Sequence, residues 1–132
     1  MPAFRWGLNL DYSVDTGFAD LVANIRQQYT ATTAPGEVSS GYFAVTSGIA
    51  LTVNAQSIGA NNIDYAVVVA YGNGQIDIVP NAQTAGASNR VDIDGTSTEP
   101  GFFALGPGAN LNSIVLRSDS GTINFQVFLA GD

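Results

Sequence analysis

Histidine, cysteine and lysine are absent from this 132-residue chain, and charged residues make up only 11% of it. Without cysteine the chain has no disulfide, no thiolate nucleophile and no cysteine-based metal site. Without histidine it lacks the commonest general acid–base group, and without lysine it has no Schiff-base amine. A Ser-His-Asp or Cys-His triad is therefore impossible within one chain, whereas a pair of catalytic carboxylates remains possible. We expect a protein that is not an enzyme and that carries no cofactor.

Positive charge is scarce and dispersed. Eleven acidic residues outweigh four arginines, which gives a formal net charge of −7. Such a surface repels phosphate groups, so we expect neither a nucleic-acid partner nor an anionic membrane partner. The N-terminal sequence lacks the pattern of a signal peptide, and the longest apolar run, from Tyr65 to Tyr71, is far shorter than a membrane span. The expected site of synthesis is the cytoplasm.

The second half of the chain alternates with a period of two, which is typical of β-strands. Glycine-rich turns separate the apolar runs, and Asn73-Gly74 is a strong hairpin signal. Asp77 is expected on the solvent side of its strand. Strands are predicted at residues 65–71, 75–79, 90–94, 101–105, 111–118 and 122–130. The predicted core comprises Val67, Val69, Ile76, Ile78, Val91, Ile93, Ile114, Leu116, Ile123, Phe125 and Val127.

The first half is less regular. Apolar residues hold the odd positions of residues 43–53, which favours one long strand bent near Gly48, with two strands as the alternative. Phe18, Leu21, Val22, Ile25 and Tyr29 recur at helical spacing and predict one short helix. Residues 4–10 are interpreted as a first strand and residues 30–41 as a loop.

These patterns predict one all-β domain over residues 1–132, in which residues 1–41 form an N-terminal arm with the helix and the loop. Seven or eight short strands with regular turns are typical of an antiparallel β-sandwich of jelly-roll type.

Two patterns could carry a ligand. Asp92, Asp94 and Gly95 resemble part of a calcium loop, with Glu99 as the best added ligand, but Arg90 and Gly101 stand where the loop pattern needs acidic residues. A strand end followed by a turn explains the same residues, so no metal site is predicted. Exposed aromatic residues would suit the stacking of sugars in a lectin-like module, although aromatic residues fill cores and interfaces more often. The aromatic residues considered for this role are Trp6, Tyr12, Tyr29 and Tyr42.

The stretch from Leu111 to Gly131, LNSIVLRSDSGTINFQVFLAG, resembles the closing hairpin of small jelly-roll proteins that decorate the capsids of tailed bacteriophages. The whole chain is similar to phage virion proteins in its richness in Gly, Ala, Ser, Thr and Asn. The resemblance implies a non-enzymatic structural accessory (cement) protein, made in the host cytoplasm and located in the virion. It also implies a symmetric homo-oligomer, most simply a trimer, that binds and stabilises the shell of the major capsid protein.

Several apolar residues exceed what strands with one buried face require. Phe128 interrupts the polar side of its strand, and the neighbours Phe102 and Phe103 must point in opposite directions. Phe4 and Trp6 lie near the N-terminus. We therefore expect these five residues to supply contacts within an oligomer or with a shell, and a carbohydrate-binding β-sandwich module is the alternative function.

Overall fold

The computed structural model describes residues 5–13, 21–30, 37–81, 86, 89–106 and 109–131. The chain divides into two compact units, residues 1–34 and 35–132, which are treated separately below. The regular structure in the described residues is β-strand apart from 3-10 structure at η1 (Ala55–Ile58) and at Asn89. No helix in the described part of the chain is long and apolar enough to cross a membrane.

The N-terminal unit is a two-stranded antiparallel sheet formed by β1 (Arg5–Ser13) and β2 (Leu21–Thr30). Its register pairs Arg5 with Thr30 at one end and Ser13 with Leu21 at the other, with an irregularity after Tyr12. The predicted first strand is thus present from Arg5, and it continues beyond Leu10.

The predicted short helix is wrong where the structure describes it, because residues 21–30 form β2. Leu21, Ile25 and Tyr29 lie four residues apart, and this spacing keeps residues on one face of a strand as well as on one face of a helix. Pairing with β1 along the whole strand satisfies the backbone N–H and C=O groups of alternate residues of β2. Phe18 and the proposed helix cap lie outside the described residues.

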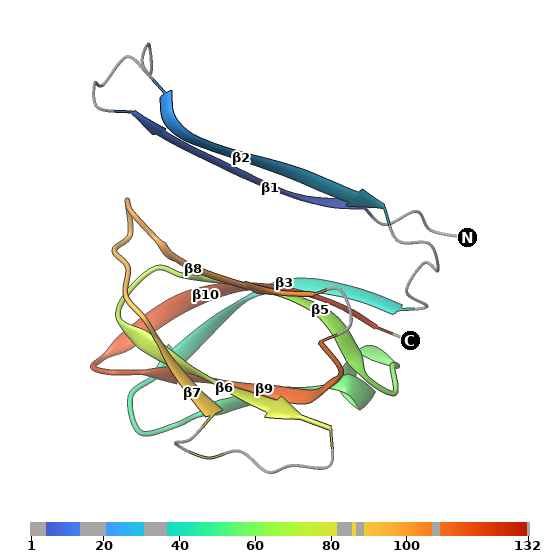
Figure 1. Cartoon of the computed structure of the whole chain (residues 1–132). Helices are drawn as coiled ribbons and strands as arrows, with labels where there is room; N and C mark the ends of the chain where they lie inside the picture. The colour runs from blue at the N-terminus through green and yellow to red at the C-terminus, as the bar shows by residue number, and fades with distance from the viewer. Residues whose placement is uncertain are drawn as a thin grey trace. The chain divides into compact units, whose positions relative to one another are not determined.

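The larger unit contains eight strands whose described pairings are all antiparallel. Pairing divides them into two groups of four, in the orders β3-β10-β5-β8 and β4-β9-β6-β7. A single bridge between Ile63 and Leu111 joins the groups, and Figure 1 shows them as two facing layers. The strands are β3 (Glu37–Thr46), β4 (Leu51–Asn54), β5 (Ile63–Ala70), β6 (Gly74–Pro80), β7 (Arg90–Ile93), β8 (Gly101–Leu105), β9 (Leu111–Ser118) and β10 (Thr122–Gly131).

The all-β, antiparallel part of the fold prediction is confirmed, but the first long strand is divided. Residues 43–53 contribute to both β3 and β4, which pair with different partners, β10 and β9. The chain turns at Gly48, whose φ of 84° lies in the region that favours glycine. β3 also begins at Glu37, so the end of the predicted loop is strand.

Two turns were placed correctly, although the strands beside them do not form hairpins. The Asn73-Gly74 turn connects β5 to β6, and the turn at Gly121 connects β9 to β10. In both cases the two strands belong to different groups, so the chain crosses from one layer to the other. Local turn residues fix where the chain reverses, but they do not fix which strands pair.

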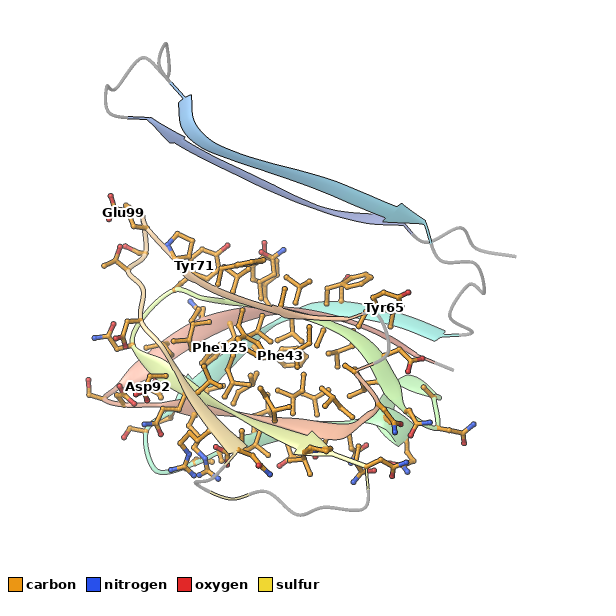
Figure 2. The ribbon with its side chains drawn as sticks, viewed as in Figure 1. Phe43, Tyr65, Tyr71, Asp92, Glu99 and Phe125 are labelled. Atoms are coloured by element: carbon orange, nitrogen blue, oxygen red, sulfur yellow. The ribbon has the colours of Figure 1, made fainter. Side chains whose placement is uncertain are left out.

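The core lies between the two layers and is centred on Phe125, which is fully buried. Figure 2 shows Phe43 and Phe125 pointing into this space. Of the predicted core, the buried members are Ile76, Ile93, Ile114, Leu116, Phe125 and Val127, while Ile78 and Ile123 are half-buried and pack against them. Val91 is half-buried.

The predicted phase of β5 is wrong. Ala66, Val68 and Ala70 are buried, whereas Val67 and Val69 are half-buried and lie on the opposite side of the strand. The small residues face inward because their neighbours on that face are large: the register partners of Ala70 and Val68 include Phe125 and Phe103, respectively. Alternation alone defined the two faces without indicating which one is inside.

Replacing Phe125 with alanine should lower the free energy of unfolding by about 3–5 kcal/mol, because apolar burial is lost and a cavity remains. The exposed neighbour Asn124 provides the control, and Asn124→Ala should change stability by less than about 0.5 kcal/mol. Denaturant unfolding of both variants measures the difference. Equal effects would place Phe125 outside the core.

Candidate interaction face and a buried aspartate

The layer β8-β5-β10-β3 has an outer face that is apolar and neutral. Alternation along the strands and the register between them align its residues in two rows across the sheet. The first row is Phe102, Val69, Gln126 and Tyr42, and the second is Ala104, Val67, Phe128 and Ser40. We call these eight residues the outer face.

The outer face exposes large side chains. Phe102 is 62% exposed and Tyr42 is 70% exposed, at the two edges of the layer. Between them, the Tyr71 hydroxyl, which extends the face beyond the first row, donates a hydrogen bond to Gln126 Oε1 at 3.2 Å. None of the eight residues is charged, although the chain carries a net charge of −7. Exposed apolar surface free of charge is typical of the centre of a protein–protein interface.

The residues predicted to form contacts are divided among different places. Phe102 and Phe128 lie on the outer face, where Phe128 is half-buried. Phe103 lies on the opposite side of β8 and packs against the core. Trp6 lies in β1 with Tyr29 as its register partner, and Phe4 lies outside the described residues.

The acidic residues considered for calcium do not gather at one place. Asp92 lies in β7, and its Oδ1 accepts a hydrogen bond from Gln75 Nε2 at 2.9 Å. Asp94 is exposed after the strand, and the backbone N–H of Glu99 donates to Thr96 Oγ1 at 2.9 Å within a turn. In the described residues no three acidic side chains gather as metal ligands would.

The layer β4-β9-β6-β7 has an ionic cluster on its outer side. Asp77 is fully buried, whereas it was expected to face solvent. Arg90 Nε donates to its Oδ1 at 2.6 Å, and Arg117 Nη2 donates to its Oδ2 at 3.0 Å. Asp77 does lie on the side of β6 away from the core, but the two guanidinium groups, with side chains 29% and 36% exposed, neutralise it.

Register explains how this cluster forms. Asp77 in β6 lies directly opposite Arg90 in β7, and Arg117 in β9 is paired with Gln75, two residues from Asp77. Both arginines therefore reach the same carboxylate from strands on either side of β6. Sequence reasoning placed Asp77 and Arg90 on solvent-facing positions, and only the unknown register concealed their contact.

The cluster fixes the protonation state of Asp77. The hydrogen bond from Arg90 lowers the pKa of the Asp77 carboxyl, burial opposes this, and Arg117 lowers the pKa further. The same contact raises the pKa of Arg90. A carboxyl with a lowered pKa is ionised at neutral pH, so Asp77 is unsuited to be the general acid of a catalytic carboxylate pair.

Comparison with known proteins identifies no family. No protein-family model and no curated protein matches this chain. One solved structure that is similar is described as "Bacillus endospore appendages form a novel family of disulfide-linked pili". The similarity has a TM-score of 0.39 and 10% sequence identity, and it covers 79% of this chain and 98% of that one. This chain, which has no cysteine, cannot form the disulfide links named there.

Replacing Asp77 with asparagine should lower the free energy of unfolding at pH 7 by about 1–3 kcal/mol, because buried hydrogen-bonded charge is lost while two cations remain together. Asp92→Asn is the matched control, since Asp92 is exposed and an amide oxygen can still accept the bond from Gln75. Its effect should stay within about 0.5 kcal/mol. Similar losses for both variants would contradict a special role for Asp77.

The Asp77 cluster should also make stability depend on pH. A carboxyl whose pKa is lower in the folded state stabilises the fold above the unfolded value of about 3.9, and this contribution is lost as the pH falls through the folded pKa. The stability difference between the native chain and Asp77→Asn should therefore be full at pH 7 and shrink below about pH 4. Urea unfolding of both proteins across this range checks the trend, and a difference that does not vary with pH would contradict it.

Proposed function

We propose that this chain is a non-enzymatic structural accessory protein of a virus particle, which binds and stabilises the capsid shell as a symmetric homo-oligomer. The observation that carries the proposal is the outer face, an apolar and neutral surface across four strands with two large exposed aromatic residues. Such a surface favours stable contact with another protein over chemistry on a small substrate.

The strand order supports a jelly-roll β-sandwich as the fold of residues 35–132. Each layer holds four strands, and the connections between consecutive strands pass from one layer to the other except between β6 and β7. Repeated crossing of this kind is what two interlocked Greek keys produce, and jelly rolls occur in viral capsid proteins and in lectins. The fold is therefore compatible with the proposed role without selecting it.

The likeness in sequence of residues 111–131 to phage decoration proteins supports the location in the virion, although β9 and β10 do not pair with each other as a hairpin. In this view, the major capsid protein is the partner outside the oligomer, and the expected oligomer is a trimer. The net charge of −7 suits a position on the outside of a shell, away from the packaged nucleic acid.

A lectin-like module is the second candidate function, and Tyr42 is the observation that favours it. An aromatic ring that is 70% exposed on a sheet face can stack against the apolar face of a sugar ring. The jelly-roll order is also compatible with carbohydrate binding. The two candidates differ in what the purified chain binds.

Sedimentation with purified capsids from the native source tests the proposal. The chain should pellet with the shells, saturate at a fixed ratio to the major capsid protein, and leave the pellet when Phe102→Asp disrupts the outer face and with it the oligomer that binds the shell. Ile49→Asp is the control, because Ile49 is 71% exposed but lies in the turn between β3 and β4. A chain that never pellets with shells but binds a glycan saturably would replace this function with the lectin-like one.

A further inference from the structure

We propose that the outer face binds the outer face of a second copy of this chain through a two-fold axis that runs across the strands. This inference rests on the homo-oligomer of the proposed function, and it names a two-fold self-contact in place of the trimer that the resemblance implies. It places Phe102 of each copy over Ala104 of the other and Tyr42 of each copy over Ser40 of the other.

The first argument is charge. Two copies that each carry −7 repel one another, and the repulsion is least where the facing surfaces have no charge. The eight residues of the outer face are uncharged. The opposite layer differs, because its described outer side carries Asp92 together with the Asp77, Arg90 and Arg117 cluster. The outer face is thus the broad sheet surface on which two acidic copies meet at the lowest electrostatic cost.

The second argument is area. The whole outer side of this layer, with four strands about 4.8 Å apart and a mean length of about eight residues at about 3.3 Å each, presents roughly 500 Å² per copy, and the eight residues of the outer face cover about half of it. Two such sides that meet over their whole length bury about 1,000 Å² in total, which reaches the lower end of specific interfaces. The expected dimer is therefore reversible, with a dissociation constant on the order of micromolar.

The third argument is shape. On each edge strand a large exposed residue lies two positions from a small exposed one: Phe102 and Ala104 in β8, and Tyr42 and Ser40 in β3. The register places the two large residues in one row and the two small residues in the next. A two-fold axis that lies between the two rows and runs across the strands places the first row of one copy over the second row of the other copy. Large residues then meet small residues at both edges.

The same two-fold rotation also brings the central residues of the two faces together. Val69 of one copy faces Val67 of the other, and Gln126 faces Phe128. The facing strands stay aligned, as they are in sheets that pack face to face. Because every contact occurs twice, the interface is isologous and closes as a dimer.

Exchange of the large and small residues tests this geometry. Phe102→Ala removes the projecting ring, and Ala104→Phe fills the space that receives it, so each change alone should weaken dimerisation by about tenfold or more. The double variant Phe102→Ala/Ala104→Phe transposes the two features, and it should recover most of the affinity. Sedimentation equilibrium up to about 100 µM measures the dissociation constants. If Ala104→Phe strengthened association, the contact would be non-specific apolar adhesion and the proposed axis would be wrong.

Two further variants separate loss of contact from loss of fold. Phe102→Asp, present twice in each dimer, should raise the dissociation constant about a hundredfold, whereas Ile49→Asp should leave it unchanged. Both should unfold at the native denaturant midpoint. A strict monomer at all concentrations, closure of the face by another segment of its own chain, or a trimer that Phe102→Asp leaves intact would overturn the inference.

The outcome is distinguishable from a failure of the proposed function. A chain that pellets with capsids but never dimerises retains the shell-binding role and loses the two-fold contact. A chain that dimerises with the predicted exchange behaviour but ignores capsids retains the contact and loses the role in the virion.

Discussion

The larger unit depends on β5, a central strand that is apolar on both sides. Its inward residues from Ala66 to Ala70 are small, which leaves the interior to Phe125 and the neighbouring large side chains. Its outward residues, Val67 and Val69, give the layer a second apolar surface. A strand with one polar side would have left the outer side of the layer polar and solvated. β5 instead contributes apolar residues to both the core and the outer face, and the outer face is the surface from which a function in protein contact is inferred.

The opposite layer, β4-β9-β6-β7, contains a buried carboxylate that is neutralised by two of the few charged residues of the chain. Asp77 occupies the middle strand, where an unpaired carboxylate would be costly to bury. Two of the four arginines converge on it from the adjacent strands, so the ionic contact links β6, β7 and β9 across their ladders. The outer sides of the two layers are thus chemically distinct, one neutral and apolar and the other ionic.

The sequence predicted local features better than pairings. Alternation located the strands from residue 63 onward, and glycine-containing turns marked where they end. Alternation could not show that Val68, and not Val67, faces the core, nor that Asp77 meets Arg90, because both facts depend on which strands become neighbours. The helical spacing of Leu21, Ile25 and Tyr29 misled for the same reason, since pairing with the preceding strand β1 outweighed the helical pattern. Of the predicted contact residues, Phe102 and Phe128 lie on the outer face, whereas Phe103 serves the core.

The register of β3 and β10 has a mechanical consequence. Glu37 is paired with Gly131, so the start of one strand and the end of the other lie at the same end of their ladder. Tension applied between these two positions acts on one backbone pair at a time and peels β10 from β3, rather than shearing all the pairs together. Resistance to such a pull is therefore that of one pair at a time and not the sum over the ladder. An assembly that strains this unit would therefore hold it more firmly by gripping the faces of the layers than by pulling on these two strand ends.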